Sequence, residues 1–321
     1  MARRTSDEHV SSPIAACSPA PTRQDPPGPC PVCGGRVKER PIVAAAWSLL
    51  PGDPSRILPN VPFWQCSRCE YLFRDDPRQT DQASEYYDQA SYVVPANEQV
   101  YSHIKGRMFR EVVRRVTSRF NLTRRQPLAV DFGCSYGHLG QTFKDAGWDV
   151  MGVDIAPSIH EHHRRKGTFP TYASLDCPDI PDGQVDAICM IDVLCYINDP
   201  VGLLRVAYRK LAPGGVLFLR VPYREQYIRW GAKLAWMFPF QFTAFAAFDH
   251  VGFWTPKTVR VAARELGFGR CHILWREKGY TYPRLTQTLF HRATQFLACA
   301  TRGAIHLATV FQAEMWKSGG S

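Results

Sequence analysis

The sequence of 321 residues has no run of uncharged residues long enough to cross a membrane and no internal repeat of fixed period. A transmembrane helix needs about 20 mostly apolar residues. The best stretch, 234–248, is shorter and contains Pro239 and Gln241. The arginines of the first ten residues are not followed by an apolar run, which argues against a secretory signal. We therefore expect a soluble, cytoplasmic protein.

Acidic residues are also scarce. The 29 Asp and Glu face 39 Lys and Arg, which leaves a formal net charge of +10. This balance suits an anionic partner, such as nucleic acid, a phosphorylated substrate or an acidic membrane surface, without selecting one of them. Apolar residues form 45% of the chain, so composition excludes a mainly disordered, collagen-like or coiled-coil protein. The eleven cysteines, an odd number, favour thiols or metal ligands over a disulfide framework.

Changes in composition along the chain mark the expected segments. The first segment has six prolines and few bulky side chains, so it buries too little apolar surface to offset its ordering entropy. Beyond two cysteine pairs, an apolar face that repeats every fourth residue predicts a helix with several basic residues on its other faces. The segments are a disordered tail (1–29), a cysteine-paired module (30–76), a helical linker (77–126), an α/β domain (127–283) with an aromatic insertion (223–255), and a helical tail (284–321).

The α/β domain shows short apolar runs that alternate with helical stretches. Strands that are apolar throughout and separated by helices indicate a parallel sheet covered on both faces. We therefore predict an α/β fold with a doubly wound, mostly parallel sheet. The predicted strands are 128–132, 149–153, 185–191, 216–221 and 271–275, and the predicted helices lie near 138–146, 157–166, 200–211 and 256–266.

A glycine-rich turn follows the first predicted strand. It spaces its glycines as Gly133-x3-Gly137-x2-Gly140, with Asp131 two residues before the first. A dinucleotide-binding turn would instead read G-x-G-x-x-G. Glycines at the carboxyl end of a strand let a ligand approach the backbone beside a helix N-terminus. The second strand ends at Asp154, whose carboxylate can accept both hydroxyl groups of a ribose.

Four blocks in this order and spacing resemble the class I S-adenosylmethionine-dependent methyltransferases. They are Val130-Asp-Phe-Gly-Cys-Ser-Tyr-Gly137, Gly152-Val-Asp-Ile155, Ile180-Pro-Asp-Gly-Gln-Val-Asp186 and Arg209-Lys-Leu-Ala-Pro-Gly-Gly215. The resemblance covers about residues 128–222. It implies a Rossmann-like methyltransferase fold over 127–283 and S-adenosylmethionine (SAM) as the cofactor.

The resemblance also implies a role for individual residues. Asp131 and the glycines would hold the methionine end of the cofactor, Asp154 its ribose and Ile155 its adenine ring. Asp176 would meet the adenine amine, and Asp192 would face cofactor and acceptor. The cofactor-site residues are thus Asp131, Gly133, Cys134, Gly137, Asp154, Ile155, Asp176 and Asp192. Many small-molecule members have Leu-Glu-His shortly after Asp192, whereas this chain has Leu194-Cys195-Tyr196. This departure disfavours a general base at these positions.

His250 is the candidate catalytic residue. The stretch Phe248-Asp-His-Val-Gly-Phe-Trp-Thr-Pro256 resembles the segment that precedes the last helix in related small-molecule methyltransferases. A base with a pKa near working pH could remove the acceptor's proton, and histidine suits that task. The alternative is that His250 only packs and hydrogen-bonds beneath the aromatic insertion.

Two C-x2-C pairs, Cys30/Cys33 and Cys66/Cys69, lie 32 residues apart. Four thiolates in tetrahedral geometry favour Zn²⁺ and leave no open coordination position, which predicts a structural zinc ribbon over 30–76. A redox C-x-x-C pair and unrelated thiols are the alternatives. Bacterial methyltransferases of sugar and natural-product pathways resemble this arrangement, and there the ribbon helps to enclose the acceptor. Residues 36–63 form an insertion of unassigned role.

The sequence therefore predicts a SAM-dependent methyltransferase acting on a small-molecule, sugar or lipid-linked acceptor. Aromatic residues in the insertion and the helical tail favour a lid that completes the core, with a pocket wall for a lipophilic acceptor or peripheral contact with a membrane as the alternatives. An RNA methyltransferase that docks through the ribbon and the basic helix is a second candidate, although no RNA-binding module is recognisable. A catalytically degenerate binding module is the third. The histidine-rich stretch 160–166 is expected to be a solvated helix face.

Overall fold

The computed structural model describes residues 27–47, 57–74, 95–120, 125–223, 228, 233, 246–247, 250–280, 285–302 and 309–319. Most of the predicted N-terminal tail and of the aromatic insertion falls outside these residues. No helix within the described ranges combines the length and hydropathy that crossing a bilayer requires.

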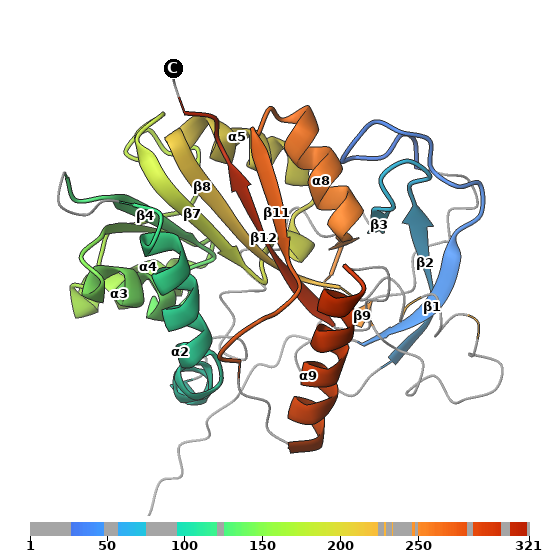
Figure 1. Ribbon diagram of the computed structural model, residues 1–321, viewed down its shortest axis with the longest axis horizontal. Coiled ribbons are helices and arrows are strands. Elements are labelled where there is room, and N and C mark those ends of the chain that lie inside the picture. The colour runs from blue at the N-terminus through green and yellow to red at the C-terminus, as the bar shows by residue number, and fades with distance from the viewer. Residues whose placement is uncertain are drawn as a thin grey trace, which may run out of the picture.

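A seven-stranded sheet in the order β11-β12-β8-β7-β4-β5-β6 forms the centre of the molecule (Figure 1). Its strands are β4 (Leu128–Phe132), β5 (Asp149–Val153), β6 (Thr171–Tyr172), β7 (Val185–Ile191), β8 (Leu211–Pro222), β11 (Arg270–Leu274) and β12 (Val310–Trp316). The five strands from β8 to β6 pair in parallel, whereas β12 runs antiparallel to both of its neighbours. This arrangement confirms the predicted α/β, doubly wound fold.

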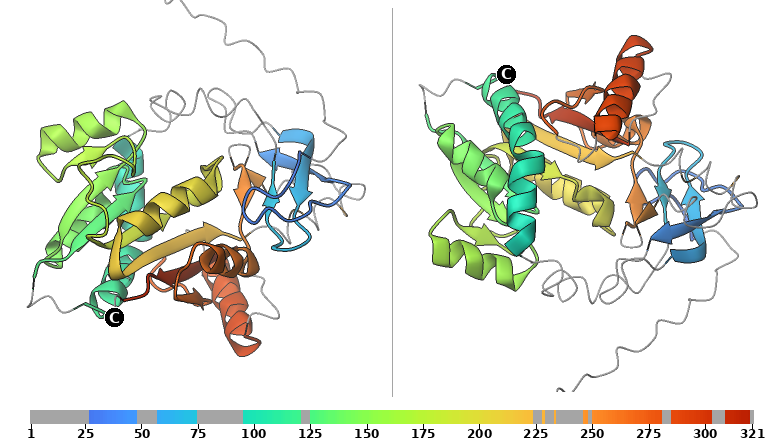
Figure 2. Two further views of the ribbon diagram at one scale, coloured as in Figure 1. Left: turned by 90° about the horizontal axis from the view of Figure 1, so that it is seen from above. Right: turned by 90° about the horizontal axis from the view of Figure 1, so that it is seen from below.

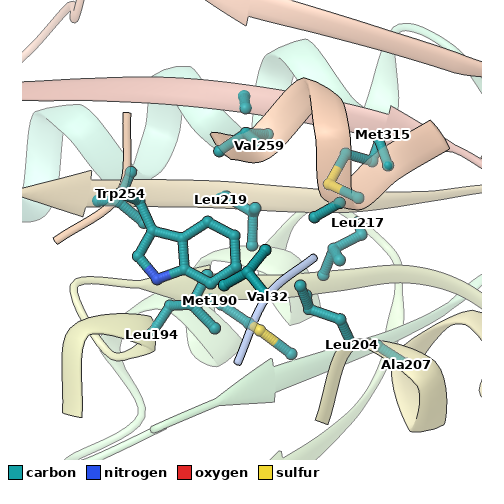
Figure 3. Close-up of a cluster of buried hydrophobic side chains, with 14 of the residues drawn as sticks. Val32, Met190, Leu194, Leu204, Ala207, Leu217, Leu219, Trp254, Val259 and Met315 are labelled. Atoms are coloured by element: carbon teal, nitrogen blue, oxygen red, sulfur yellow. The ribbon is translucent and has the colours of Figure 1, made fainter. Parts of the chain in front are cut away.

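Helices cover both faces of this sheet. They are α2 (Pro95–Thr117), α3 (His138–Asp145), α4 (Pro157–Lys166), α5 (Pro200–Lys210), α8 (Pro256–Glu265) and α9 (Leu285–Ala300). Successive residues of a strand point to opposite faces. Ala187 and Cys189 of β7 accordingly pack in a cluster with side chains of α2, α3 and α4, whereas Met190 packs with side chains of α5 and α8 (Figure 3).

The C-terminal segment differs from the predicted helical tail. Residues 285–300 form α9, but 310–316 form β12, which inserts between β8 and β11. Phe311, Ala313 and Met315 are buried on one side of β12, and Gln312 and Glu314 are buried on the other. The sequence does not predict a buried strand here, because Gln312 and Glu314 are polar. Their burial depends on tertiary contacts such as the Arg115–Glu314 ion pair.

The N-terminal module is part of a second, five-stranded sheet in the order β10-β3-β2-β1-β9. Its strands are β1 (Ile42–Trp47), β2 (Ile57–Gln65), β3 (Leu72–Phe73), β9 (Ala246–Ala247) and β10 (Gly252–Phe253). β1 and most of β2 come from the 36–63 insertion, while β9 and β10 come from the segment before α8. Figure 2 shows this sheet beside the large one, on the side opposite α3 and α4. The cysteine module is thus joined to the α/β domain by strand pairing.

Candidate active site

The glycine-rich turn joins β4 to α3. Gly133 and Gly137 have φ angles of +74° and +79°, a region that favours glycine. A Cβ on Gly133 would lie 3.0 Å from Val193, and one on Gly137 would lie 2.5 Å from the ring of His163. Cys134, between them, is buried. Both glycines are therefore required by backbone conformation and by the lack of space for a side chain.

Asp154 lies at the carboxyl end of β5, next to this turn. Its Oδ2 accepts a hydrogen bond from the amide of Ser135 at 2.9 Å, and its Oδ1 accepts one from the amide of Ala156 at 3.1 Å. These two amides fix the orientation of the carboxylate and leave its remaining lone pairs for a ligand. Ile155 follows with 42% of its surface exposed, unusual for a large apolar side chain beside a polar loop. An oriented carboxylate next to an exposed apolar side chain fits a ribose and its base.

Asp131 is buried beneath the turn, where its Oδ2 accepts a hydrogen bond from the amide of Gly140 at 3.0 Å. Burial raises the pKa of Asp131 to about 7, and the nearby charge of Asp154 adds to this rise, because both disfavour the carboxylate. The residue therefore titrates near neutral pH instead of near 4.

This raised pKa predicts a pH-dependent stability difference. The folded state holds the proton of Asp131 more tightly than the unfolded state, so this group's contribution is complete below pH 4 and is lost as pH rises to about 7. We expect Asp131→Asn, which keeps a hydrogen-bond acceptor, to remove this loss. Relative to wild type, the variant should gain on the order of 2–4 kcal/mol between pH 4 and pH 8 in urea unfolding. Parallel pH profiles of the two proteins would contradict this, and exposed Asp149→Asn is the control.

Two histidines of α4 support the glycine-rich turn and the loop at Asp154 from behind. The Nε2 of His163 lies 2.7 Å from the carbonyl oxygen of Ser135, and the Nε2 of His160 lies 2.9 Å from that of Asp154. A carbonyl only accepts, so each Nε2 donates to it, and in a neutral ring Nδ1 accepts from a threonine hydroxyl, which is Thr168 for His163 and Thr171 for His160. Burial lowers the pKa of His163, which favours this neutral form. Sequence reasoning expected a solvated face here, because only the fold brings α4 behind the turn.

Asp176 and Asp192 pair with residues other than those that hold Asp131 and Asp154. Asp176 is exposed and pairs with Arg209 of α5. Asp192, at the end of β7, pairs with Lys105 of α2 at 2.8 Å and with Arg220 of β8. Burial raises the pKa of Asp192, but the charges of Arg220 and Lys105 outweigh it and hold that pKa well below the usual range. Asp192 is therefore ionised at neutral pH and poorly suited to take up a proton.

His250 lies against the short helix η2 (Leu194–Tyr196). Its Nε2 is 3.2 Å from the hydroxyl of Tyr196, and their rings meet edge to face at 4.9 Å. The amide of Val251 donates to the carbonyl of Cys195 at 2.8 Å, which ties this segment to η2. Tyr196 of η2 is thus the direct partner of His250.

The four cysteines of the N-terminal module converge on one point. Their sulfurs all lie within 4.8 Å of one another, with Cys30–Cys69 at 3.6 Å and Cys33–Cys66 at 3.5 Å. Tetrahedral zinc with bonds of about 2.3 Å would separate its sulfurs by about 3.8 Å. The amides of Val32 and Arg68 point at the sulfurs of Cys30 and Cys66, as suits thiolates. This donor set fits a closed Zn²⁺ site.

A family model described as a methyltransferase domain matches residues 102–270, more than half of the chain. The chain belongs to this family. The domain is thus a SAM-dependent methyltransferase domain, as predicted.

Curated relatives of this methyltransferase domain are ubiquinone biosynthesis O-methyltransferases. The one from Methylococcus capsulatus is 29% identical over 97 residues, which are 28% of this chain and 41% of the relative. The one from Pseudomonas aeruginosa is 24% identical over 165 residues, 49% of this chain and 69% of the relative.

Solved structures resemble this methyltransferase domain weakly. A SAM-dependent methyltransferase from Archaeoglobus fulgidus aligns with a TM-score of 0.45 and 16% identity, over 69% of this chain and 99% of that one. The plantazolicin methyltransferase BamL aligns with a TM-score of 0.44 and 10% identity, over 74% of this chain and 96% of that one. The strand order and the family match show the fold of this domain.

Proposed function

We propose that the protein transfers the methyl group of SAM to a small-molecule acceptor, a class that includes sugars and lipid-linked intermediates. The observation that carries this proposal is the Asp154 carboxylate, oriented by the amides of Ser135 and Ala156 beside the Gly133–Gly137 turn. The curated relatives are named O-methyltransferases, which supports a hydroxyl oxygen as the atom that receives the methyl group. Transfer of label from SAM to hydroxylated quinone precursors, with S-adenosylhomocysteine as co-product, tests it.

The bound cofactor would supply an already activated methyl group, so the chain mainly needs to orient the reactants. Asp154 would accept the ribose hydroxyls, and the glycine backbone would leave room for the methionine end. Asp131 would support the turn from beneath, because its carboxyl group accepts a hydrogen bond from the amide of Gly140. Asp192, clamped by Lys105 and Arg220, would form a fixed polar wall on the acceptor side.

We assign the removal of the acceptor's proton to His250, with Tyr196 orienting its ring. On this basis His250→Ala is expected to lower kcat by roughly 10²–10⁴, the usual contribution of a general base, while leaving the affinity for S-adenosylhomocysteine unchanged. Single-turnover kinetics and calorimetry would measure the two quantities separately. His272→Ala is the matched control, because His272 is half exposed on β11 and pairs only loosely with Glu314. Full turnover by His250→Ala would return His250 to a packing role.

We further propose that the four-cysteine cluster binds zinc as a structural ion in a ribbon that borders the acceptor.

RNA is disfavoured as the acceptor, because two of the basic residues on α2 point into the protein. Lys105 pairs with Asp192, and Arg115 pairs with the buried Glu314. Steeply salt-dependent RNA binding would be needed to restore that alternative.

A further inference from the structure

Helix α9 has the reverse of the usual amphipathic arrangement. The side chains that it buries include His291, Thr294 and Gln295, each about 5% exposed or less, and Ala298. The Nε2 of His291 lies 3.7 Å from Glu277, a buried carboxylate, so this polar face completes a buried ionic cluster. A helix on the surface of a globular protein normally buries its apolar face and exposes its polar face. Because these polar residues are buried, the opposite face of α9, which points to solvent, has to carry large apolar residues of the helix.

That opposite face is strongly apolar. Six large apolar side chains in the described part of the chain are exposed, and four of them belong to α9: Leu285 (74%), Leu289 (57%), Phe290 (55%) and Phe296 (75%). Residues 285, 289 and 296 are spaced by four and seven, which places them along one line of the helix. Figure 1 shows α9 extending clear of the strands of the seven-stranded sheet. A contiguous exposed apolar stripe of this kind marks an interaction surface.

We propose that the exposed face of α9 docks onto an anionic lipid bilayer. The helix has no acidic residue, and its exposed Arg292 lies between Leu289 and Phe296 in sequence, with exposed Arg302 just beyond its end. Aromatic and aliphatic side chains flanked by arginine suit a helix that lies in the headgroup region. The net charge of +10 adds a long-range attraction to the same surface.

A second copy of the chain fits this face less well. An antiparallel pairing of α9 with its own copy across a two-fold axis brings the middle of one helix against the middle of the other. The middle of Leu285–Ala300 is Arg292 and Ala293, so the two Arg292 guanidinium groups would meet without an acidic partner on either helix. Such like-charge contact is unfavourable, whereas an anionic bilayer supplies counter-charges.

The helix that carries the stripe is also linked, through its buried face, to Asp192, the residue that we place on the acceptor side of the proposed site. Glu277, which the buried face of α9 contacts, pairs with Arg220, and Arg220 pairs with Asp192 at the end of β7. Docking through α9 would therefore hold the acceptor side near the bilayer, where a lipid-linked acceptor resides. Lipid binding itself does not depend on the methyl-transfer reaction, so its test does not need an acceptor.

The test is flotation of the full-length, zinc-replete protein with vesicles of phosphatidylcholine, with and without phosphatidylglycerol. We expect wild type to float with the anionic vesicles and less with the neutral ones. Leu289→Gln/Phe296→Gln should lower the bound fraction about tenfold or more. Val43→Gln is the matched control, because Val43 is an exposed apolar side chain (44%) on β1. All three proteins should melt at the same temperature, since these side chains are exposed.

A second variant separates charge from apolar contact. Arg292→Glu should reduce binding to anionic vesicles several-fold and leave binding to neutral vesicles unchanged. The proposal is overturned if wild type floats with neither vesicle, or if the double glutamine variant floats as well as wild type. It is also overturned if light scattering shows a wild-type dimer that the double variant converts to a monomer, which would make α9 an interface between copies.

Discussion

The Asp154→Ala variant is expected to bind S-adenosylhomocysteine at least about 100-fold more weakly than wild type. The substitution removes the carboxylate that would accept the ribose hydroxyls, and hydrogen bonds to a charged group are worth roughly 1.5–3 kcal/mol each. It also removes the acceptors for the amides of Ser135 and Ala156, so the glycine turn loses its link to the end of β5. Calorimetric titration of the zinc-replete protein measures the effect directly.

Asp149→Ala is the matched control for this experiment. Asp149 begins the same strand, β5, and its side chain is exposed at the end away from the glycine turn. Its replacement should leave the affinity within about twofold of wild type, as expected for an exposed residue outside the site. Equal affinity of wild type and Asp154→Ala would refute the assignment of this carboxylate. A folded wild type that does not bind at all would instead favour the non-catalytic binding module.

Loss of the metal from the four-cysteine cluster is expected to lower the melting temperature by roughly 10 °C or more. Structural zinc contributes a large part of the folding free energy of small modules, and each kcal/mol lost lowers the melting temperature by about 2–4 °C in a domain of this size. The loss should spread beyond the cysteines. The hydroxyl of Thr258 in α8 donates to the carbonyl of Cys69 at 2.9 Å, and Tyr71 packs edge to face on Trp254.

Thermal melts with and without a chelator, together with metal analysis of the purified protein, would measure this effect. Cys66→Ser should reproduce the chelator result, because Cys66 is fully buried in the cluster. Cys299→Ser, at an exposed thiol of α9, should change neither zinc content nor melting temperature. A wild-type protein that lacks stoichiometric zinc and ignores the chelator would favour the redox pair or unrelated thiols.

Much of the fold could be predicted because its signals are local. The predicted strands 128–132 and 149–153 match β4 and β5, since uninterrupted apolar runs between helices leave few other arrangements. The helix predicted after Thr255 begins at Pro256, with the Thr255 side chain accepting from the amide of Thr258. The C-x2-C pairs predicted a convergence of thiols that the structure shows.

Other features could not be predicted because they depend on contacts between distant segments. β12 is separated from β8 by more than 85 residues, and its buried Glu314 is stable there only because Arg115 of α2 reaches it. Asp192 reads in sequence as one more strand-end carboxylate, and its two cationic partners come from α2 and β8. The same holds for His160 and His163, whose roles depend on carbonyls in other loops.

The sequence by itself determined the α/β class, the glycine-rich turn and the cysteine pairs, because glycine spacing, apolar runs and thiol pairs act over a few residues. Only the tertiary structure decided which charges are neutralised, which histidines hold the loops and which face of α9 stays exposed. The physical reason is that burial and ion pairing depend on what lies opposite a side chain. For α9, His291 faces Glu277, whereas Leu285, Leu289 and Phe296 face outward, and the sequence of the helix alone does not tell which of its faces the protein covers.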